Sequence, residues 1–320
     1  MSFIKDIFNF NSKLLKKRGS IVTIGVFDGV HRGHQEIIKR VAAEGNFKGL
    51  ISLVITFYPH PLQVISKNSP LLIYNLEKRI KLIKKLGIKK VLVINFNPVI
   101  ATLSPEDFVS QILIDKLNMK KIWVGTDHTF GIKKGGDFSL LKEISQKYSF
   151  EVESISPLKI DKEVVCSSVI RKSISEGEIK KANKLLNHIY RITGKVAAGS
   201  KRGAKMGYPT ANLLLEKEFV IPSQGEYATF VKYKNKYYQS FTNIGIRPTF
   251  KEQNLILETH LFNFSKDIYQ ETITVYFIEK IRPEFCFPNG QELIKQIEKD
   301  KILVSEILNR DDYLSLMKKI

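Results

Sequence analysis

Apolar runs of strand length alternate with amphipathic stretches in the first half of the chain. These runs hold few polar residues, which is typical of parallel strands buried on both faces, and they cover residues 21–26, 50–57, 91–96, 121–125 and 150–155. Helical periodicity lies between them at residues 35–43, 76–86 and 104–117. The last of these begins with Ser104, Pro105 and Asp107, which suit the N-cap, first and third helical positions of an acidic capping box. The alternation predicts an α/β domain with a parallel sheet.

The pattern changes near residue 190. A helical stretch at residues 178–186 is followed by short strand-like runs that are separated by turns, at 227–233, 237–241, 255–262 and 272–278. Helical periodicity returns only at residues 290–316. We therefore expect a small antiparallel β-barrel with C-terminal helices, and a division of the chain into domains of residues 1–187 and 188–320.

Length and composition fit this division. A chain of 320 residues can form two domains, each with its own core. No apolar run is long enough to cross a bilayer, and the N-terminus lacks the apolar core and cleavage site of a signal peptide, so we expect a cytoplasmic protein without membrane partners. The two cysteines, Cys166 and Cys286, are too far apart in sequence to suggest a disulfide framework or a cysteine metal site.

The formal net charge of +19 raises the question of nucleic-acid binding. The lysines are scattered as pairs along the chain, with most of the excess in the first half, and they do not gather on one helix with interleaved aromatic residues. We interpret them as a lysine-rich surface that attracts polyanionic nucleotides, and nucleic acid is not an expected partner.

Residues 24–34 combine a strand end, a tight glycine turn, a helix start and two histidines. Such a turn presents backbone N–H groups and the positive end of a helix dipole to an anion, and His31 and His34 could donate hydrogen bonds to charge developing on a phosphorus atom. Each feature also has an ordinary interpretation as a plain turn or a structural histidine. A zinc site is not completed by ligands of suitable spacing. The combination favours phosphate chemistry, with the candidate residues Gly25, Phe27, Asp28, His31, Gly33 and His34.

Three further segments follow predicted strands and could contact a ligand there. His60 stands between two prolines, and Asp127 lies in a loop with glycines at both ends, residues 125–131. Ser167 or Ser168 could cap a helix whose first turn carries Arg171, which could reach a phosphate at the same helix end. A plain exit turn, a surface turn and simple helix capping are the alternatives.

The segment His31-Arg32-Gly33-His34, preceded by Gly-x-Phe-Asp-Gly-Val, resembles the His-x-Gly-His nucleotidyltransferases. In particular it is similar to the adenylyltransferase module of bacterial bifunctional riboflavin kinase/FAD synthetases, whose Phe-x-Pro-His-Pro loop is also present. The resemblance implies a Rossmann-like domain in which His31 and His34 are catalytic. It further implies that nucleotide or flavin is bound by Gly25, Phe27, Asp28, Gly33, His60, Asp127, Ser167, Ser168 and Arg171. His128 replaces the family's usual Phe, and the Ser-Ser-Arg segment is one residue tighter than the family's.

In the second half, residues 194–207 are rich in glycine and basic residues. A loop of this composition can wrap around a polyphosphate, although it is not a P-loop because no Gly-Lys-Ser/Thr follows at the required spacing. The hydroxyl of Thr210 and the amide of Asn212 could both face one Mg²⁺ ion, or they could simply bond to the backbone of a turn. The candidate ligand-binding residues of the loop are Gly199, Arg202, Lys205 and Gly207.

Residues 243–250, 258–264 and 281–283, together with the glycine-rich loop and Pro209-Thr210-Ala211-Asn212, resemble the riboflavin kinase domain. That resemblance implies that Glu258 is the general base for the ribityl 5′-hydroxyl, that Thr210 and Asn212 hold Mg²⁺, and that Asn243 and Arg282 contact nucleotide or substrate.

The expected function is therefore bifunctional flavin cofactor synthesis. The C-terminal domain would phosphorylate riboflavin to FMN, and the N-terminal domain would adenylylate FMN to FAD, with ATP as co-substrate and Mg²⁺ as cofactor. The alternatives are that only one activity is retained, or that the fold serves a flavin- or nucleic-acid-binding protein. The sequence does not predict the oligomeric state.

Overall fold

The computed structural model describes residues 4–10, 12–66, 69–199, 203, 207–248 and 253–310. The chain forms two compact units, residues 1–167 and 168–320. The functional boundary expected at residue 187 stays a prediction. Within the part of the chain that is described, no helix is both long and apolar enough to cross a membrane.

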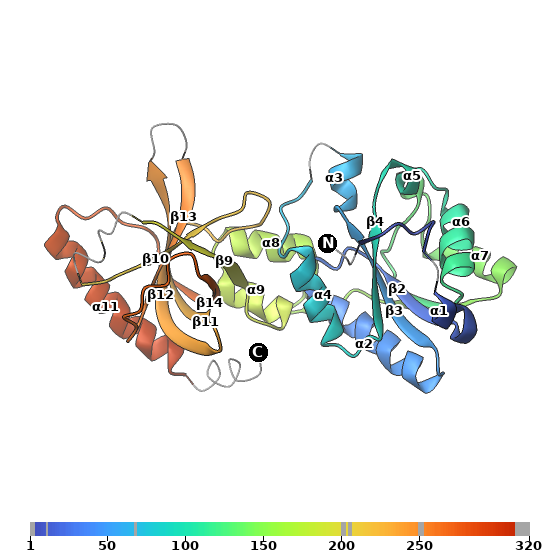
Figure 1. Cartoon of the computed structure of the whole chain (residues 1–320), viewed down its shortest axis with the longest axis horizontal. Coiled ribbons are helices and arrows are strands. Elements are labelled where there is room, and N and C mark those ends of the chain that lie inside the picture. Colours follow the sequence, from blue (N-terminus) through green and yellow to red (C-terminus); the bar gives the residue numbers. More distant parts are fainter. Residues whose placement is uncertain are drawn as a thin grey trace. The chain divides into compact units, whose positions relative to one another are not determined.

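The first unit is built on a parallel sheet, as the sequence predicts (Figure 1). Its strands have the order β1-β4-β3-β2-β5-β6, and every neighbouring pair is parallel. The bounds are β1 Ile4–Lys5, β2 Ser20–Ile24, β3 Ile51–Tyr58, β4 Lys90–Asn95, β5 Met119–Gly125 and β6 Glu151–Ile155. The five longer strands lie within a few residues of the predicted apolar runs, because such runs are stable only where both faces are covered.

Helices cover both faces of this sheet. On one face of the sheet, Ile21 and Val54 pack against α2 and α4. On the other face, Val22, Leu53 and Ile55 pack in a cluster with residues of the segment 108–116 and of α7. The helices are α1 Lys13–Arg18, α2 Arg32–Phe47, α3 Pro61–Ile65, α4 Leu76–Lys84, α5 Pro98–Ala101, α6 Pro105–Asp107 and α7 Phe138–Tyr148. The alternation of inward and outward residues along β2 and β3 therefore serves two separate cores.

The helix expected over residues 104–117 is only partly an α-helix. The Ser104 hydroxyl oxygen accepts a hydrogen bond from the Asp107 N–H at 3.0 Å, which confirms the N-cap. Instead of reaching the Ser104 backbone, the Asp107 carboxylate accepts a hydrogen bond from the Ser104 hydroxyl at 2.6 Å. The α-helical turn ends at Asp107 and a π-helix, Phe108–Lys116, continues from it.

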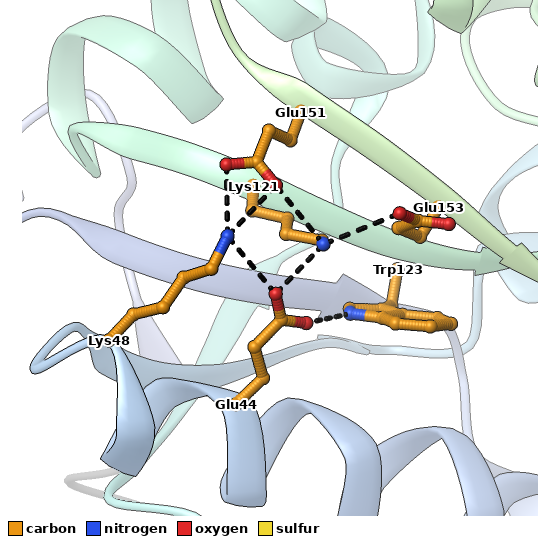
Figure 2. Close-up of polar contacts among 6 residues, drawn as sticks. All are labelled: Glu44, Lys48, Lys121, Trp123, Glu151 and Glu153. Carbon is orange, nitrogen blue, oxygen red and sulfur yellow. Dashed lines mark hydrogen bonds and ion pairs between the residues drawn. The ribbon is translucent and has the colours of Figure 1, made fainter.

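An ion-pair network fastens the C-terminal part of α2 to the sheet (Figure 2). Lys121 on β5 is 5% exposed, and its Nζ lies 2.8 Å from Glu44, 3.1 Å from Glu151 and 3.5 Å from Glu153. Lys48 bridges Glu44 and Glu151, and the indole N–H of Trp123 donates to Glu44 at 2.7 Å. The network thus holds a nearly buried cation among three carboxylates.

The second unit contains a closed antiparallel barrel with the order β10-β13-β12-β11-β14-β9, which confirms the predicted barrel (Figure 1). The bounds are β9 Arg191–Ala197, β10 Ala211–Leu214, β11 Gly225–Tyr233, β12 Lys236–Pro248, β13 Gln253–Leu261 and β14 Thr272–Arg282. Helices α8 Ser167–Ser175 and α9 Ile179–Leu186 precede it, and α11 Gly290–Leu308 follows it. The Asn183 amide of α9 donates to the Phe277 carbonyl oxygen at 2.9 Å, so α9 is fastened to β14.

One expectation about this unit needs correction. Strands β9 and β10 fall where a loop and a turn were expected, so residues 194–197 of the glycine-rich segment belong to β9 and Asn212 belongs to β10. Of the C-terminal helices expected over residues 290–316, the structure describes α11, which ends at Leu308, and residues 311–316 of that stretch lie outside the described residues.

The barrel has a polar cluster in its interior, and part of its outer face packs apolar residues against α11. Thr229, Ser240, Thr242 and Thr259 are fully buried and share hydrogen bonds, with Thr229 Oγ1 2.7 Å from both Ser240 Oγ and Thr242 Oγ1. On the outer face, Phe230 and Phe241 pack with Val304 and Leu308 of α11. Residues that share the outer face of β11, β12 and β13 therefore lie on the side that α11 covers.

Candidate active sites

The turn that follows β2 has an uncommon backbone. Phe27, Gly29 and Val30 have φ angles of 53°, 77° and 46°. A β-branched residue such as Val30 is an outlier in this left-handed region, and such strain persists only where surrounding contacts hold it. The sequence does not reveal this strain, because only Gly29 is a residue type that signals it.

Contacts from several elements hold this turn. The Val26 carbonyl oxygen accepts hydrogen bonds from the hydroxyl of Thr56 at 3.1 Å and from the guanidinium of Arg79. The Gln35 amide donates to the Val30 carbonyl oxygen at 2.8 Å, and the Ser167 hydroxyl donates to the Asp28 carbonyl oxygen at 3.0 Å.

The buried carboxylate of Asp28 also belongs to these contacts. It accepts hydrogen bonds from the backbone N–H groups of Ile73 at 3.0 Å and Tyr74 at 3.3 Å. These bonds tie the turn to the segment before α4. The structure thus gives Asp28 a role in holding the turn, and its role in ligand binding stays a prediction.

The two histidines lie together at the start of α2. His31 is the N-cap, with its Nδ1 accepting the His34 N–H at 3.4 Å, and the two rings stack with centroids 3.5 Å apart. Gly33 lies beside this stack, and a Cβ at that position would be in van der Waals contact with the His31 ring at 3.4 Å. The rings of Phe27 and His34 form a T-shaped pair with centroids 5.1 Å apart. Gly25 faces the same phenyl ring, since a Cβ at that position would lie 3.3 Å from Phe27.

Burial lowers the pKa of His34 well below its usual value, and the nearby His31 and Arg79 lower it further. His34 is therefore neutral at physiological pH. Its Nδ1 is buried and has no hydrogen-bond partner among the described residues. A neutral ring beside the first N–H groups of a helix can donate one hydrogen bond to a phosphate oxygen without carrying a charge of its own.

Two more candidate loops follow strands that neighbour β2. His60 follows β3 and caps α3: its Nδ1 accepts the Leu62 N–H at 3.1 Å, and its own N–H donates to Gln63 at 3.0 Å. Asp127 follows β5, and glycine at position 125 leaves room for it, because a Cβ there would lie 2.7 Å from the Asp127 carboxylate. The sheet order therefore brings the turn after β2 and the loops after β3 and β5 to the same edge.

His128 behaves as an aromatic ring in this loop. It stacks on Phe130 with centroids 6.0 Å apart and an interplanar angle of 12°. Burial lowers its pKa to about 4, against a small opposing effect of Asp127, so the ring is uncharged at neutral pH. Ser168 and Arg171 lie on α8, and their contact with ATP phosphates stays a prediction.

The second unit aligns its candidate residues in one row across the barrel. The strand register pairs Asn212 with Glu258, Glu258 with Asn243, Asn243 with Glu226 and Glu226 with Arg282. Residues paired in this way face the same side of a sheet. The row runs over β10, β13, β12, β11 and β14 on the outer face, where Arg282 reaches Asp300 of α11 at 2.7 Å.

Glu226 connects the row to α11. Its Oε1 accepts the Asn243 amide N–H at 2.9 Å and lies 3.8 Å from Arg282, whose guanidinium forms three hydrogen bonds to Asp300. Burial raises the pKa of Glu226 to about 7, although Asn243 and Arg282 act in the opposite direction. Its Oε2 is buried without a partner among the described residues. Sequence reasoning missed Glu226, although a glutamate within an apolar strand run was an available signal.

Thr210 and Asn212 occupy a setting that suits a hard cation. Asn212 is 7% exposed, and its Oδ1 is buried with no hydrogen-bond partner in the described part of the chain. Gly199 lies against this amide so closely that a Cβ there would overlap it. Amide and hydroxyl oxygens are ligands that Mg²⁺ accepts together with substrate phosphates. Among the described residues, no three or more His, Cys, Asp or Glu side chains gather as an alternative metal site.

The segment before these residues is held by His260, another residue that sequence reasoning missed. Its Nδ1 lies 2.8 Å from the Pro209 carbonyl oxygen, and its ring contacts Tyr208 at a centroid distance of 5.4 Å. Gly207 is exposed and has a φ of 86°, which favours glycine. The predicted ligands Arg202 and Lys205 lie outside the described residues.

Comparisons with known proteins match both halves of the chain. The family model described as FAD synthetase matches residues 13–169, and the one described as riboflavin kinase matches residues 186–308. A protein of Buchnera aphidicola (subsp. Acyrthosiphon pisum) named bifunctional riboflavin kinase/FMN adenylyltransferase is 38% identical over 97% of this chain and 99% of its own length. Proteins of the same name from Haemophilus influenzae and Escherichia coli (strain K12) are 34% and 32% identical; the alignments cover 94% and 96% of this chain and 97% of each relative.

A solved structure also matches nearly the whole chain. It is titled as a macrolide-efflux protein from Streptococcus pneumoniae and superposes with a TM-score of 0.86 at 29% identity. The match covers 95% of this chain and 99% of that one. Counterparts of both units therefore occur together in one solved protein chain.

Proposed function

The chain belongs to the bifunctional riboflavin kinase/FMN adenylyltransferase family, and we propose that it phosphorylates riboflavin to FMN and adenylylates FMN to FAD. ATP is the co-substrate of both reactions. The observation that carries the proposal is that two different sets of candidate catalytic groups lie in separate compact units, the histidine stack in the first and the Asn212–Glu258 row in the second. We assign both reactions to the cytoplasm, where ATP and riboflavin meet.

In adenylyl transfer, a phosphate oxygen of FMN attacks the α-phosphorus of ATP. A phosphorus–oxygen bond forms, the bond to the β-phosphate breaks, and pyrophosphate leaves. The N-terminal N–H groups of α2 and the neutral ring of His34 supply hydrogen bonds to the charge that develops on the α-phosphate oxygens, and His31 orients His34 through the ring stack. The family resemblance assigns the ATP phosphates to Ser168 and Arg171 of α8. Within the first unit, His60 and Asp127 contribute to ligand binding in the loops at the same sheet edge as the histidine turn.

In the kinase reaction, the ribityl 5′-hydroxyl of riboflavin attacks the γ-phosphorus of ATP and ADP leaves. Glu258 accepts the hydroxyl proton, and Asn243 on the neighbouring strand orients the substrate. Thr210 and Asn212 would hold Mg²⁺, which would neutralise charge at the phosphate oxygens. The unpartnered Oδ1 of Asn212 supports this assignment, because a buried amide oxygen is costly unless a ligand satisfies it.

Loss of activity in the first unit is an alternative because His128 stands where the family usually has Phe. An uncharged ring that stacks on Phe130 preserves the aromatic character of that position, which supports the proposal that adenylyl transfer is retained.

A crossed pair of variants tests the two assignments. Wild type incubated with riboflavin, ATP and Mg²⁺ should yield FMN and FAD by chromatography. Glu258→Gln should slow riboflavin phosphorylation by roughly 10² to 10⁴, the usual scale of a general base, while added FMN still becomes FAD. His34→Ala should slow FAD formation by about 10² to 10³, so that FMN accumulates. Loss of both reactions from either substitution in a folded protein would indicate one shared site and overturn the proposal.

A further inference from the structure

Arg79 is a buried cation behind the strained turn of the first unit. It lies on α4, is 1% exposed, and belongs to none of the motifs that indicate the active site. Its Nη1 donates to the Val26 carbonyl oxygen and lies 3.4 Å from the Thr56 hydroxyl oxygen. Its Nε is buried without a hydrogen-bond partner in the described residues.

The lysines of the same helix show that this burial is a special case. Lys81 pairs with Glu77 while 69% of its side chain is exposed, and Lys84 is also exposed. A charged guanidinium loses hydration when it is buried, and a neutral donor could bond to the Val26 carbonyl without that loss. Burial accordingly lowers the pKa of Arg79, and only the negative charge of Asp28 acts in the other direction.

The position of this charge gives it two effects on the site. Arg79 bonds directly to the turn that carries Phe27 and Val30 in left-handed conformations, so it fixes the backbone that leads into α2. It also acts electrostatically on His34, together with the stacked ring of His31. Because little solvent separates these groups, the charge is weakly screened.

We propose that Arg79 is a positioning residue for adenylyl transfer, a buried cation that fixes the Gly25–Val30 turn and attracts the ATP phosphates from behind it. The inference rests on the adenylyl transfer proposed above. The positive charge itself is part of the role, since it acts across the turn without touching the substrate. If Arg79 only held the turn in place, any hydrogen-bond donor at this position would be sufficient.

Three variants separate these roles. Arg79→Met removes charge and donors, Arg79→Lys keeps the charge, and Lys81→Met removes one exposed charge from the same helix as a matched control. Initial rates of FMN conversion to FAD are measured against ATP concentration and pH, and urea unfolding followed by the fluorescence of Trp123 on β5 shows whether the first unit of each variant is folded. We expect Arg79→Met to lower kcat/KM for ATP about 10-fold or more, the scale of a lost charge-assisted contact, and Lys81→Met to stay within about 2-fold of wild type.

The pH dependence distinguishes charge from structure. His31, stacked on His34, and Arg79 on α4 are the titratable groups that act on His34 in the described structure. Removing the Arg79 cation should raise the pKa of His34, so the acid limb of the rate profile should move to higher pH in Arg79→Met and return in Arg79→Lys. If Arg79→Met does not fold, Arg79→Gln replaces it, because Gln keeps a donor and loses the charge.

NMR titration of the His34 ring provides a readout that needs no turnover. The His34 pKa should rise in Arg79→Met or Arg79→Gln and stay near the wild-type value in Arg79→Lys. Unchanged titration and unchanged ATP dependence would overturn the inference, and so would a loss of rate that Arg79→Lys does not rescue. A wild-type protein that makes no FAD would contradict the proposed function instead, while the titration would still decide the role of the Arg79 charge.

Discussion

The ring of His260 on β13 holds the backbone of Pro209, with Nδ1 of the histidine 2.8 Å from the carbonyl oxygen. A carbonyl oxygen only accepts hydrogen bonds, so Nδ1 carries the proton. Pro209 directly precedes Thr210, and Asn212 follows two residues later on β10. The strand that carries the proposed base Glu258 therefore also positions the proposed metal ligands.

We expect His260→Phe to weaken riboflavin phosphorylation about 2- to 10-fold in kcat/KM, which corresponds to the loss of one hydrogen bond of ordinary net strength. His260→Asn should retain most of the activity, because an amide N–H can donate from nearly the position of Nδ1. Conversion of FMN to FAD measures the other unit and should not change. Equal rates in the Phe and Asn variants would contradict this positioning role.

Thr210→Val tests the proposed Mg²⁺ site with a side chain of the same shape and no hydroxyl. The Mg²⁺ concentration needed for half-maximal riboflavin phosphorylation should rise roughly 10-fold or more, as is usual when a metal site loses a supporting group. Excess Mg²⁺ should restore part of the rate, since substrate phosphates share the ion. Thr210→Ser is the matched control. If the Val and Ser variants depend on Mg²⁺ concentration in the same way, Thr210 is not a ligand of the ion.

The fold of the first unit could be predicted because its strands are nearly continuous apolar runs. Residues 51–56 of β3 are all buried, and such runs are stable only inside a sheet that is covered on both faces. The histidine turn could also be found, because its residue types are unusual together. The φ angles of Phe27 and Val30 could not, because neither side chain favours them and contacts from Thr56, Arg79 and Ser167 hold the turn.

Strands β9 and β10 were missed because their composition hides the alternation. Gly194 interrupts β9 in the sequence, but in the barrel it leaves room for Leu213, since a Cβ at that position would lie 3.2 Å from the leucine side chain. Glu226 and His260 were missed as site residues for a related reason. Glu226 gains its role from the register of the neighbouring strands, and His260 gains its role from the distant carbonyl group of Pro209. Neither relationship is visible in the local sequence.

Glu226→Gln should change how stability depends on pH. The pKa of Glu226 is about 7 in the folded protein against an ordinary value of 4.5, so the native state binds the proton more tightly than the unfolded state. This contribution is fully present below about pH 4.5 and is lost as the pH rises through 7. Gln is uncharged at every pH, so the variant should be more stable than wild type at pH 8, by up to about 3 kcal/mol, and similar to it below pH 5.

Urea unfolding of the full chain at pH 5 and pH 8, followed by circular dichroism, measures this difference. Glu292→Gln on α11 is the control, because 49% of the Glu292 side chain is exposed and its loss should have no such pH dependence. A stability difference between Glu226→Gln and wild type that is the same at both pH values would show that Glu226 is ionised throughout.

The network around Lys121 gives a prediction for the stability of the first unit (Figure 2). Lys121→Met keeps the length of the side chain but removes the cation that Glu44, Glu151 and Glu153 share. The side chains of Glu151 and Glu153 are 59% and 50% exposed and can regain water, whereas that of Glu44 is 20% exposed and keeps only Lys48 and Trp123 among the described residues. We expect a loss of about 1 to 3 kcal/mol, between the values typical of exposed and buried ion pairs.

The contribution of the network has a defined pH window. Burial alone would raise the pKa of Glu44, but hydrogen bonds from Lys121 and Trp123 outweigh the effect of burial, so the pKa is lowered. Hydrogen bonds from Lys48 and Lys121 likewise lower the pKa of Glu151. Burial opposes the charge of Lys121, yet bonds to the two glutamates raise its pKa. The stabilisation is therefore present between about pH 4.5 and 10.5. It is lost as the pH falls through the pKa values of Glu44 and Glu151 or rises through the pKa of Lys121.

Trp123 is the only tryptophan of the chain and lies within the network, so its fluorescence follows urea unfolding of the first unit directly. Lys121→Met should lower the urea midpoint at pH 7, and the difference from wild type should shrink at pH 3, where the glutamates are protonated in both proteins. Lys120→Met, at an exposed lysine next to Lys121 on β5, removes one charge outside the network and should leave the midpoint nearly unchanged. Equal midpoints for the two variants at pH 7 would show that the shared cation does not stabilise the fold.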